Sequence, residues 1–204
     1  MSKAAAASLA GLGGAAGIGG GIYLLNSNSK TPTYKKGTVG HKLQSEKFTI
    51  LNAEGDADHW KLLKEEYNKA KSTTSKVFES HTSDIEEGKL KELCKAALEK
   101  DEGDASYSKA KRWCVVPVSV SEYLKNWNIV ALPTNTDNSD KQDKWTALAN
   151  SYASSNNKIS NVATLSDQKW QTLRAECKKL EVKKNYDDDF DSAFGSSKIW
   201  CVEK

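Results

Sequence analysis

The sequence predicts a mainly α-helical protein with minor β structure, in which an N-terminal transmembrane helix precedes two tandem copies of a small helical unit. Three observations predict this fold class. An uncharged run lies near the N-terminus, apolar residues recur at helical spacing in the rest of the chain, and a Trp-Cys-Val triplet occurs twice, in "RWCVVPVS" and in "IWCVEK". With only 4 Cys and 6 Trp in 204 residues, two such triplets indicate a duplication.

Composition is normal for a globular body, with 38% hydrophobic and 28% charged residues. The formal net charge is only +3, and lysines alternate with acidic residues instead of forming basic blocks. A protein that binds nucleic acid would show a concentrated basic patch or stripe. The sequence therefore predicts no nucleic-acid partner.

Residues 1–30 form the expected membrane anchor. Residues 4–25 are uncharged and follow Lys3; as a helix they would reach roughly 33 Å, enough for a ~30 Å hydrocarbon core. Seven glycines dilute the apolar side chains, so membrane insertion is marginal. The alternative is a cleaved signal peptide, but its hydrophobic region is shorter and ends in a small-x-small site, which "LLNSNSK" does not resemble. These arguments favour an uncleaved single-pass anchor.

Three glycines of the anchor, Gly13, Gly17 and Gly21, fall four positions apart. This spacing lines one helix face with hydrogen atoms and would allow a second copy of the anchor to pack closely. The alternative is that some glycines of a Gly/Ala-rich anchor align without a packing role. The orientation of the anchor stays open, because the lysines after the run favour an internal body, whereas long domains translocate largely regardless of flanking charge.

After a polar tether, residues 31–38, the chain aligns with itself as repeat unit one, residues 39–116, and repeat unit two, residues 117–204. The segment "DHWKLLKEEY" matches "DKWTALANSY", and "SDIEEGKLKELCK" matches "SDQKWQTLRAECK". Upstream, "KFTIL" is aligned with "NWNIV", which pairs Phe48 with Trp127 and Ile50 with Ile129. The length difference between the copies is assigned to the turn-rich stretch "PTNTDNSDKQ".

Within each copy, the expected elements follow from periodicity. The short apolar runs at residues 48–51 and 128–132 are the strand candidates. Apolar residues spaced to lie on one face predict two amphipathic helices in each copy. In the first copy, a third helix is expected to begin at about residue 105 and to end before Pro117. The predicted buried faces, with their matches in the second copy, are Trp60, Leu63, Tyr67 and Ala70 with Trp145, Leu148, Ala149 and Tyr152, and Leu90, Leu93, Cys94, Ala97 and Leu98 with Trp170, Leu173, Cys177 and Leu180.

The four cysteines pair naturally by copy, Cys94 with Cys114 and Cys177 with Cys201, although four cysteines allow three connectivities. Such pairs suit a body outside the cytoplasm. One alternative is four buried thiols that act as small apolar side chains, because Cys94 and Cys177 lie on apolar faces. The other is a four-cysteine zinc site, which no Cys-x-x-Cys motif or His pair supports.

No motif for catalysis, metal or cofactor binding stands out. His41, His59 and His81 are scattered and are expected at the surface. The acidic run "NYDDDFDS" begins like a calcium loop, but Ser192 stands where the loop needs glycine and Lys198 where it needs glutamate, so a solvated loop or helix start is expected. The sequence predicts no catalytic residues, no metal site and no cofactor.

The chain resembles the short paralogous hypothetical proteins of haemotropic mycoplasmas. The resemblance rests on the glycine-rich "ASLAGLGGAAGIGGGIYLL", the Ser/Asn/Lys tether, "KRWCVVPVS" and the terminal "WCV". It implies a family of membrane-anchored, surface-exposed proteins without assigned activity, suspected of roles in immune evasion or host-cell contact.

Together these observations predict a non-enzymatic surface protein of the cell membrane, single-pass, with an extracellular body. Its expected partners are the membrane, a host protein and, through the anchor, a second copy of itself. An adhesin with a defined host ligand and an anchored hydrolase with an unrecognised site are the alternatives. The matched positions are Trp, Leu, Tyr, Cys and capping Asp, which are folding residues, and this favours the non-enzymatic reading.

Overall fold

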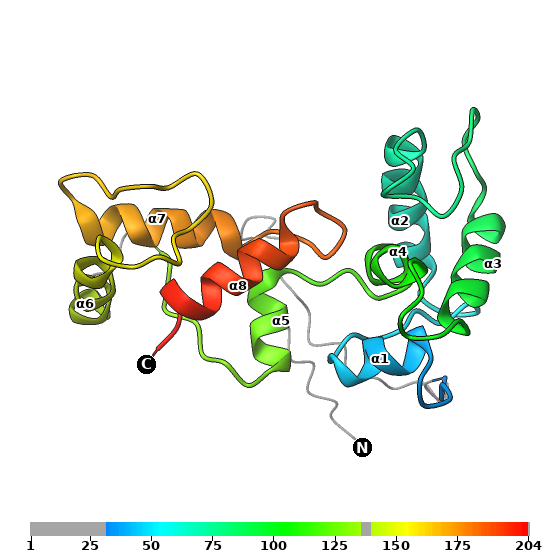
Figure 1. Cartoon of the computed structure of the whole chain (residues 1–204), viewed down its shortest axis with the longest axis horizontal. Coiled ribbons are helices and arrows are strands. Elements are labelled where there is room, and N and C mark those ends of the chain that lie inside the picture. Colours follow the sequence, from blue (N-terminus) through cyan, green and yellow to red (C-terminus); the bar gives the residue numbers. More distant parts are fainter. Residues whose placement is uncertain (1–31, 136–139, 204) are drawn as a thin grey trace, which may run out of the picture.

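The structure is a computed structural model that describes residues 32–135 and 140–203 (Figure 1). This part of the chain is mainly α-helical, as predicted, and its β structure is limited to isolated bridges. The helices are α1 (Val39–Ser45), α2 (Ala57–Ala70), α3 (Glu87–Leu98), α4 (Ser106–Trp113), α5 (Val120–Asn126), α6 (Gln142–Tyr152), α7 (Lys169–Glu181) and α8 (Phe190–Trp200). None of these helices has the length and apolar character to cross a membrane. The predicted anchor, residues 1–30, lies outside the described residues.

The helices form two groups, which we call the first half (α1–α4) and the second half (α5–α8) (Figure 1). Matched backbone hydrogen bonds relate the two groups. Leu51 N–H donates to Cys114 O at 3.1 Å, and Leu132 N–H donates to Cys201 O at 2.8 Å. Single antiparallel bridges flank these bonds, Ile50 with Val115 and Ala131 with Val202.

The same bonds correct the alignment made at residues 48–51. Phe48 N–H donates to Leu43 O, and Ile129 N–H donates to Leu124 O, so the structure pairs Phe48 with Ile129 and not with Trp127. The predicted strands, residues 48–51 and 128–132, are also wrong, because each contributes only one bridge residue to a very short partner segment.

Two helices were not expected from periodicity, α1 and α5, each of 7 residues. Side chains that satisfy free backbone N–H groups at their N-termini explain why they form. Thr38 accepts from His41 N–H, and Ser119 and Glu122 form a reciprocal capping box at the start of α5. The third helix is shorter than predicted, because α4 ends at Trp113 and the chain then turns extended to pair with residues 49–51, well before Pro117.

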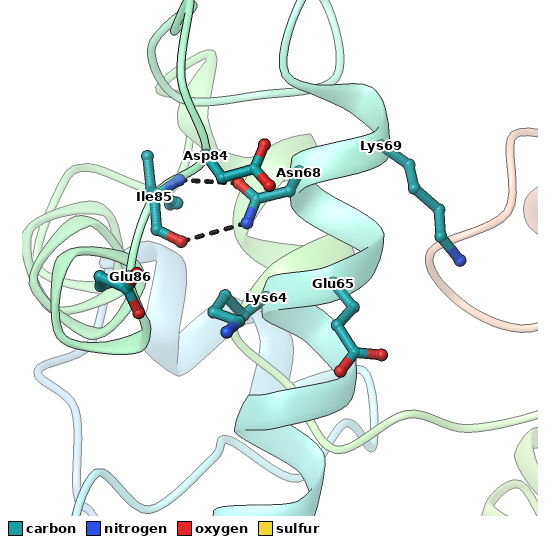
Figure 2. A pocket seen from close by; sticks show the side chains of 7 residues that line it. All are labelled: Lys64, Glu65, Asn68, Lys69, Asp84, Ile85 and Glu86. Atoms are coloured by element: carbon teal, nitrogen blue, oxygen red, sulfur yellow. Dashed lines mark hydrogen bonds between the residues drawn. The ribbon is translucent and has the colours of Figure 1, made fainter.

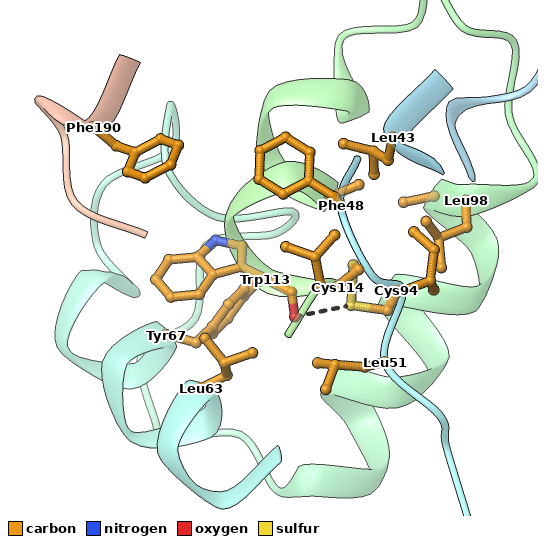
Figure 3. Packing of buried hydrophobic residues seen from close by; sticks show 14 of the residues in the cluster. Leu43, Phe48, Leu51, Leu63, Tyr67, Cys94, Leu98, Trp113, Cys114 and Phe190 are labelled. Carbon is orange, nitrogen blue, oxygen red and sulfur yellow. Dashed lines mark hydrogen bonds between the residues drawn. A yellow bond between two sulfur atoms is a disulfide. The ribbon is translucent and has the colours of Figure 1, made fainter. Parts of the chain in front are cut away.

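The buried apolar residues form two clusters, both built on the tryptophans and tyrosines that the periodicity placed on buried faces. The first core holds the buried residues of the first half together with residues of α5 and α8, and the second core lies in the second half alone. In the first half, Trp60 and Trp113 are 2% exposed and Tyr67 is fully buried. In the second half, Trp145 and Tyr152 are buried to the same degree. Phe190 of α8 belongs to the first core, where it lies beside Phe48 and Trp113 (Figure 3).

The described part of the predicted tether, residues 32–38, packs against α1 instead of standing free. The ring of Tyr34 lies so close to Gly40 that a Cβ there would come within 2.4 Å of it, which explains the glycine. Gln44 Nε2 donates to Pro32 O at 2.7 Å. The part of the predicted tether that the structure describes is therefore attached to the first half.

Candidate interaction site

Ring contacts, ion pairs and hydrogen bonds join the two halves, and the centre of this junction is aromatic. The ring of Phe48 stacks on Tyr123 of α5 with 4.5 Å between ring centroids. Phe194 of α8 contacts the same tyrosine at 4.6 Å. The Tyr123 hydroxyl donates to Glu46 O at 2.6 Å, and burial raises the pKa of Tyr123 to about 12. At neutral pH this tyrosine therefore stays an uncharged donor.

Ion pairs surround the aromatic contacts. Asp188, just before α8, accepts from Arg112 Nη1 at 2.9 Å and from Lys76 Nζ, both from the first half. Lys111 pairs with Asp191 in the same way. The hydrogen bond from Lys76, followed by that from Arg112, holds the pKa of Asp188 below its usual range. The acidic run that was expected to be a solvated loop or helix start does precede α8, but two of its carboxylates join the halves.

Asn185 forms hydrogen bonds that hold the segment between α4 and α5, which connects the halves, against the end of α4. It is only 4% exposed. Its Oδ1 accepts from Val118 N–H at 2.8 Å, and its Nδ2 donates to Lys111 O at 3.0 Å. Its own N–H donates to Val118 O at 3.0 Å. One amide side chain thus satisfies backbone groups of the connecting segment and of α4, so buried polar groups at the junction are paired.

Two hollows open beside the junction. One, of about 260 Å³, is lined on both sides by charged groups, among them Lys76, Arg112 and Asp188. The other, of about 200 Å³, lies over the connecting segment, with Phe48 and Pro117 among its lining residues. Each has room for about one side chain of a partner.

A larger hollow, of about 440 Å³, lies wholly within the first half, between α2 and residues 84–86 (Figure 2). Asn68 holds its wall in place, because its side chain donates to Ile85 O at 3.1 Å and accepts from Ile85 N–H at 2.9 Å. The lining mixes cations with carboxylates, and the residues are Lys64, Glu65, Asn68, Lys69, Asp84, Ile85 and Glu86. The second half has Ala153 at the position that matches Asn68, so it lacks this support.

The predicted cysteine residues form two disulfides, Cys94–Cys114 and Cys177–Cys201, with Cα–Cα distances of 5.4 and 5.7 Å. Each joins the third helix of its half, α3 or α7, to the Trp-Cys segment, as the copy-wise pairing expected. Because all four cysteines are in disulfides, none is free as a thiol or as a zinc ligand in this structure. Figure 3 shows the first disulfide inside the first core, under Trp113.

Other residues singled out from the sequence have ordinary places. His41, His59 and His81 are half-buried and not fully exposed as expected, and they lie on different elements of the first half. Asp187 accepts from Lys184 N–H, and Asp189 pairs with Lys183. Gly13, Gly17 and Gly21 lie outside the described residues. Within residues 32–135 and 140–203, no three His, Cys, Asp or Glu side chains gather in a way that could hold a metal ion.

Sequence reasoning missed Asp188, Asn185 and Phe48 as the residues that join the halves. The partners of Asp188 lie 112 and 76 positions away, so no local pattern could reveal them. In the part of the chain that the structure describes, the geometry supports binding through side chains at the junction or in the hollow of the first half. Comparisons with protein-family models, curated proteins and solved structures find no match to this chain.

We expect Asp188→Asn to weaken the junction in a pH-dependent way. The pKa of Asp188 is lower in the folded protein than the value of ~3.9 expected in the unfolded chain. The ionised carboxylate therefore stabilises the folded protein fully above pH ~3.9, and this stabilisation is lost as the pH falls through the pKa of the folded state. Because the carboxylate is largely exposed, the loss at pH 7 is modest, about 0.5–1 kcal/mol in denaturant unfolding. The matched control is Asp167→Asn, an exposed aspartate that should leave stability unchanged. A difference between Asp188→Asn and wild type that is equally large below pH 3 would contradict the ionic explanation.

Proposed function

We propose that the protein is a single-pass protein of the cell membrane, whose body is formed by two copies of a duplicated helical unit, stands outside the cell and binds other macromolecules without catalysing a reaction. The observation that carries this proposal is the pair of disulfides at matched places, one in each half. Disulfides form and persist mainly outside the reducing cytosol. An extracellular body also requires translocation and retention, for which residues 1–30 supply the candidate anchor.

The duplication is supported by side-chain contacts as well as by the backbone. In both halves the tryptophan of the second helix donates its indole N–H to a carbonyl of the loop before that helix, Trp60 of α2 to Asn52 O and Trp145 of α6 to Pro133 O. Both tyrosines that follow accept a backbone N–H from the loop behind them, Phe78 for Tyr67 and Ile159 for Tyr152. Chance similarity of two helical groups would not reproduce such paired details.

A role in host contact follows from the resemblance to surface proteins of haemotropic mycoplasmas. The apolar residues that the two halves share are buried, whereas most of their exposed residues differ, apart from matched polar positions such as Asp58 with Asp143. The surface is therefore largely free to vary while the fold is kept. An adhesin with a defined ligand is the second candidate, because the hollow held by Asn68 occurs in the first half only. We propose a host protein as the partner in either case.

Protease treatment of intact cells tests the proposal. An antibody against the body should detect loss of the protein when protease is added outside, and a cytoplasmic protein in the same cells should survive as the control. Membrane fractions washed with alkaline carbonate should retain the full chain. Protection of the body until the cells are lysed would contradict the extracellular assignment, and release by carbonate would contradict the anchor.

A further inference from the structure

The distance between the anchor and the body is short. Residues 26–31 are the only chain between the predicted span and the first described residue, Pro32. Six residues reach at most ~20 Å when fully extended. In a membrane-anchored protein, which is the function proposed above, the surface of the body around Pro32 must therefore lie close to the lipid headgroups.

A chain of contacts leads from Pro32 to one end of α5. Pro32 O accepts from Gln44 Nε2 at 2.7 Å, and Gln44 O accepts from Lys47 N–H at 3.0 Å. Lys47 O in turn accepts from Asn126 Nδ2 at 3.3 Å. In Figure 1, α1 and one end of α5 lie along the same edge of the molecule. Trp127, which directly follows Asn126, is thus close to the point where the chain leaves for the anchor.

Trp127 differs from the tryptophans that are shared by the two halves. It is 40% exposed, whereas those four are at most 2% exposed. One edge of its indole rests against Tyr123, with 6.3 Å between ring centroids in a T-shaped contact. Its matched position in the first half is Glu46, so burial in a core does not account for a tryptophan here. An indole with one apolar side and one polar N–H is typical of the membrane–water interface.

Cations accompany this tryptophan. Lys35 and Lys36 lie three and four positions after Pro32. Lys47 accepts the hydrogen bond from Asn126 through its backbone O, and Lys125 directly precedes Asn126. All four are exposed, and none makes an ion pair with another described residue. Unpaired lysines beside an exposed tryptophan complement an anionic lipid surface.

We propose that the body docks on the bilayer that holds its anchor, with Trp127 in the headgroup layer and with Lys35, Lys36, Lys47 and Lys125 on anionic phospholipid headgroups. We call this surface the Trp127 face. Docking would fix the orientation of the body relative to the membrane. The hollow in the first half would then always face a partner from the same direction. Two more exposed apolar residues lie near α5. Val130 follows Trp127 by three positions, whereas Val182 lies at the opposite end of the helix, where Val120 N–H donates to Lys183 O.

The test uses the full chain reconstituted in vesicles that carry a phospholipid with a nitroxide quencher near the headgroup. We expect quenching of tryptophan fluorescence in vesicles of phosphatidylcholine mixed with phosphatidylglycerol, and much less in phosphatidylcholine alone. Trp127→Phe should remove most of this quenching. Both leaflets have the same composition, so the direction of insertion does not affect the result. Raising the salt from ~0.1 to ~1 M should weaken docking, because the Debye length falls from ~10 to ~3 Å.

Matched variants separate docking from general charge. Replacing Lys35, Lys36, Lys47 and Lys125 by glutamine should lower the docking equilibrium constant on the order of a thousandfold. The control removes the same number of charges from exposed lysines elsewhere, namely Lys61, Lys95, Lys169 and Lys178, and it should keep the quenching. Val182→Ser is the apolar control. Circular dichroism of each variant checks that the helices are kept.

Two different results would overturn two different proposals. If the full chain does not float with vesicles, the anchor is absent, and both the proposed function and the docking fail. If the chain floats but Trp127→Phe leaves the quenching unchanged, or if the two sets of lysine variants behave alike, the anchor stands and the docking is wrong. A water-soluble quencher is the second probe. If it fails to quench Trp127, and the nitroxide lipid also fails to quench it, the Trp127 face contacts a protein and not the membrane.

Discussion

Replacing Cys94 and Cys114 together by alanine is expected to lower the free energy of unfolding by about 3 kcal/mol. The disulfide closes a loop of 20 residues, and such a loop restricts the unfolded chain by about that amount in the chain-entropy model. Both cysteines are at most 2% exposed, so the sulfurs also fill space in the first core. The change should be larger than that of any single ion pair in the described structure, because those are exposed to water.

Guanidinium denaturation of a chain that begins at Thr31 measures this loss. Peptide mapping without reductant should first recover Cys94 linked to Cys114 and Cys177 linked to Cys201. The reduced wild-type protein is the control, since it should lose more stability than the double variant because both bonds are broken. Four free thiols in protein taken from the cell surface would refute the disulfides, and the extracellular assignment would lose its strongest support.

Phe48→Ala is expected to lower the free energy of unfolding by about 3–4 kcal/mol and to loosen the two halves from each other. The ring is 4% exposed, stacks on Tyr123 and lies 6.5 Å from Phe190, measured between ring centroids. Its removal leaves a cavity between a residue of the first half and two residues of the second. The halves should then unfold in separate steps, visible as a broader transition or as two transitions with different probes.

Ile129→Ala is the matched control, because Ile129 occupies the position of Phe48 in the second half. No third unit covers Ile129 in the described structure, and the side chain is only half-buried. Its truncation should therefore cost clearly less and should leave the transition cooperative. Equal losses for the two variants would show that the junction does not depend on Phe48.

The parts of the fold that the sequence predicts are those with local signals. Helices α2, α3, α6 and α7 have 11 to 14 residues, long enough for an apolar face to repeat several times. The disulfides follow from the matched positions of the cysteines. Helices α1 and α5 have only 7 residues, too few for a clear period, although the Ser119–Glu122 capping box was a readable signal for α5.

The parts that the sequence does not predict depend on contacts between distant segments. The acidic run before α8 looks like a solvated stretch because its partners, Lys76, Lys111 and Arg112, belong to the other half. The alignment of Phe48 with Trp127 was wrong because it was based on matching two aromatic residues. The equivalent backbone hydrogen bonds of Phe48 and Ile129 show that these two residues are the matched pair. The junction is therefore a product of tertiary packing that no local pattern describes.

Neither disulfide crosses the junction between the halves, and this has a consequence for how the protein is made. Cys94 and Cys114 both precede Cys177 by more than 60 positions. In a chain that is exported from its N-terminus onward, they emerge when they are the only two cysteines outside, so a single pairing is available in place of the three that four cysteines allow. Cys177 and Cys201 then emerge to find no free thiol but each other. In a chain exported in this order, each cysteine would meet only its native partner, so no wrong bond would have to be reshuffled.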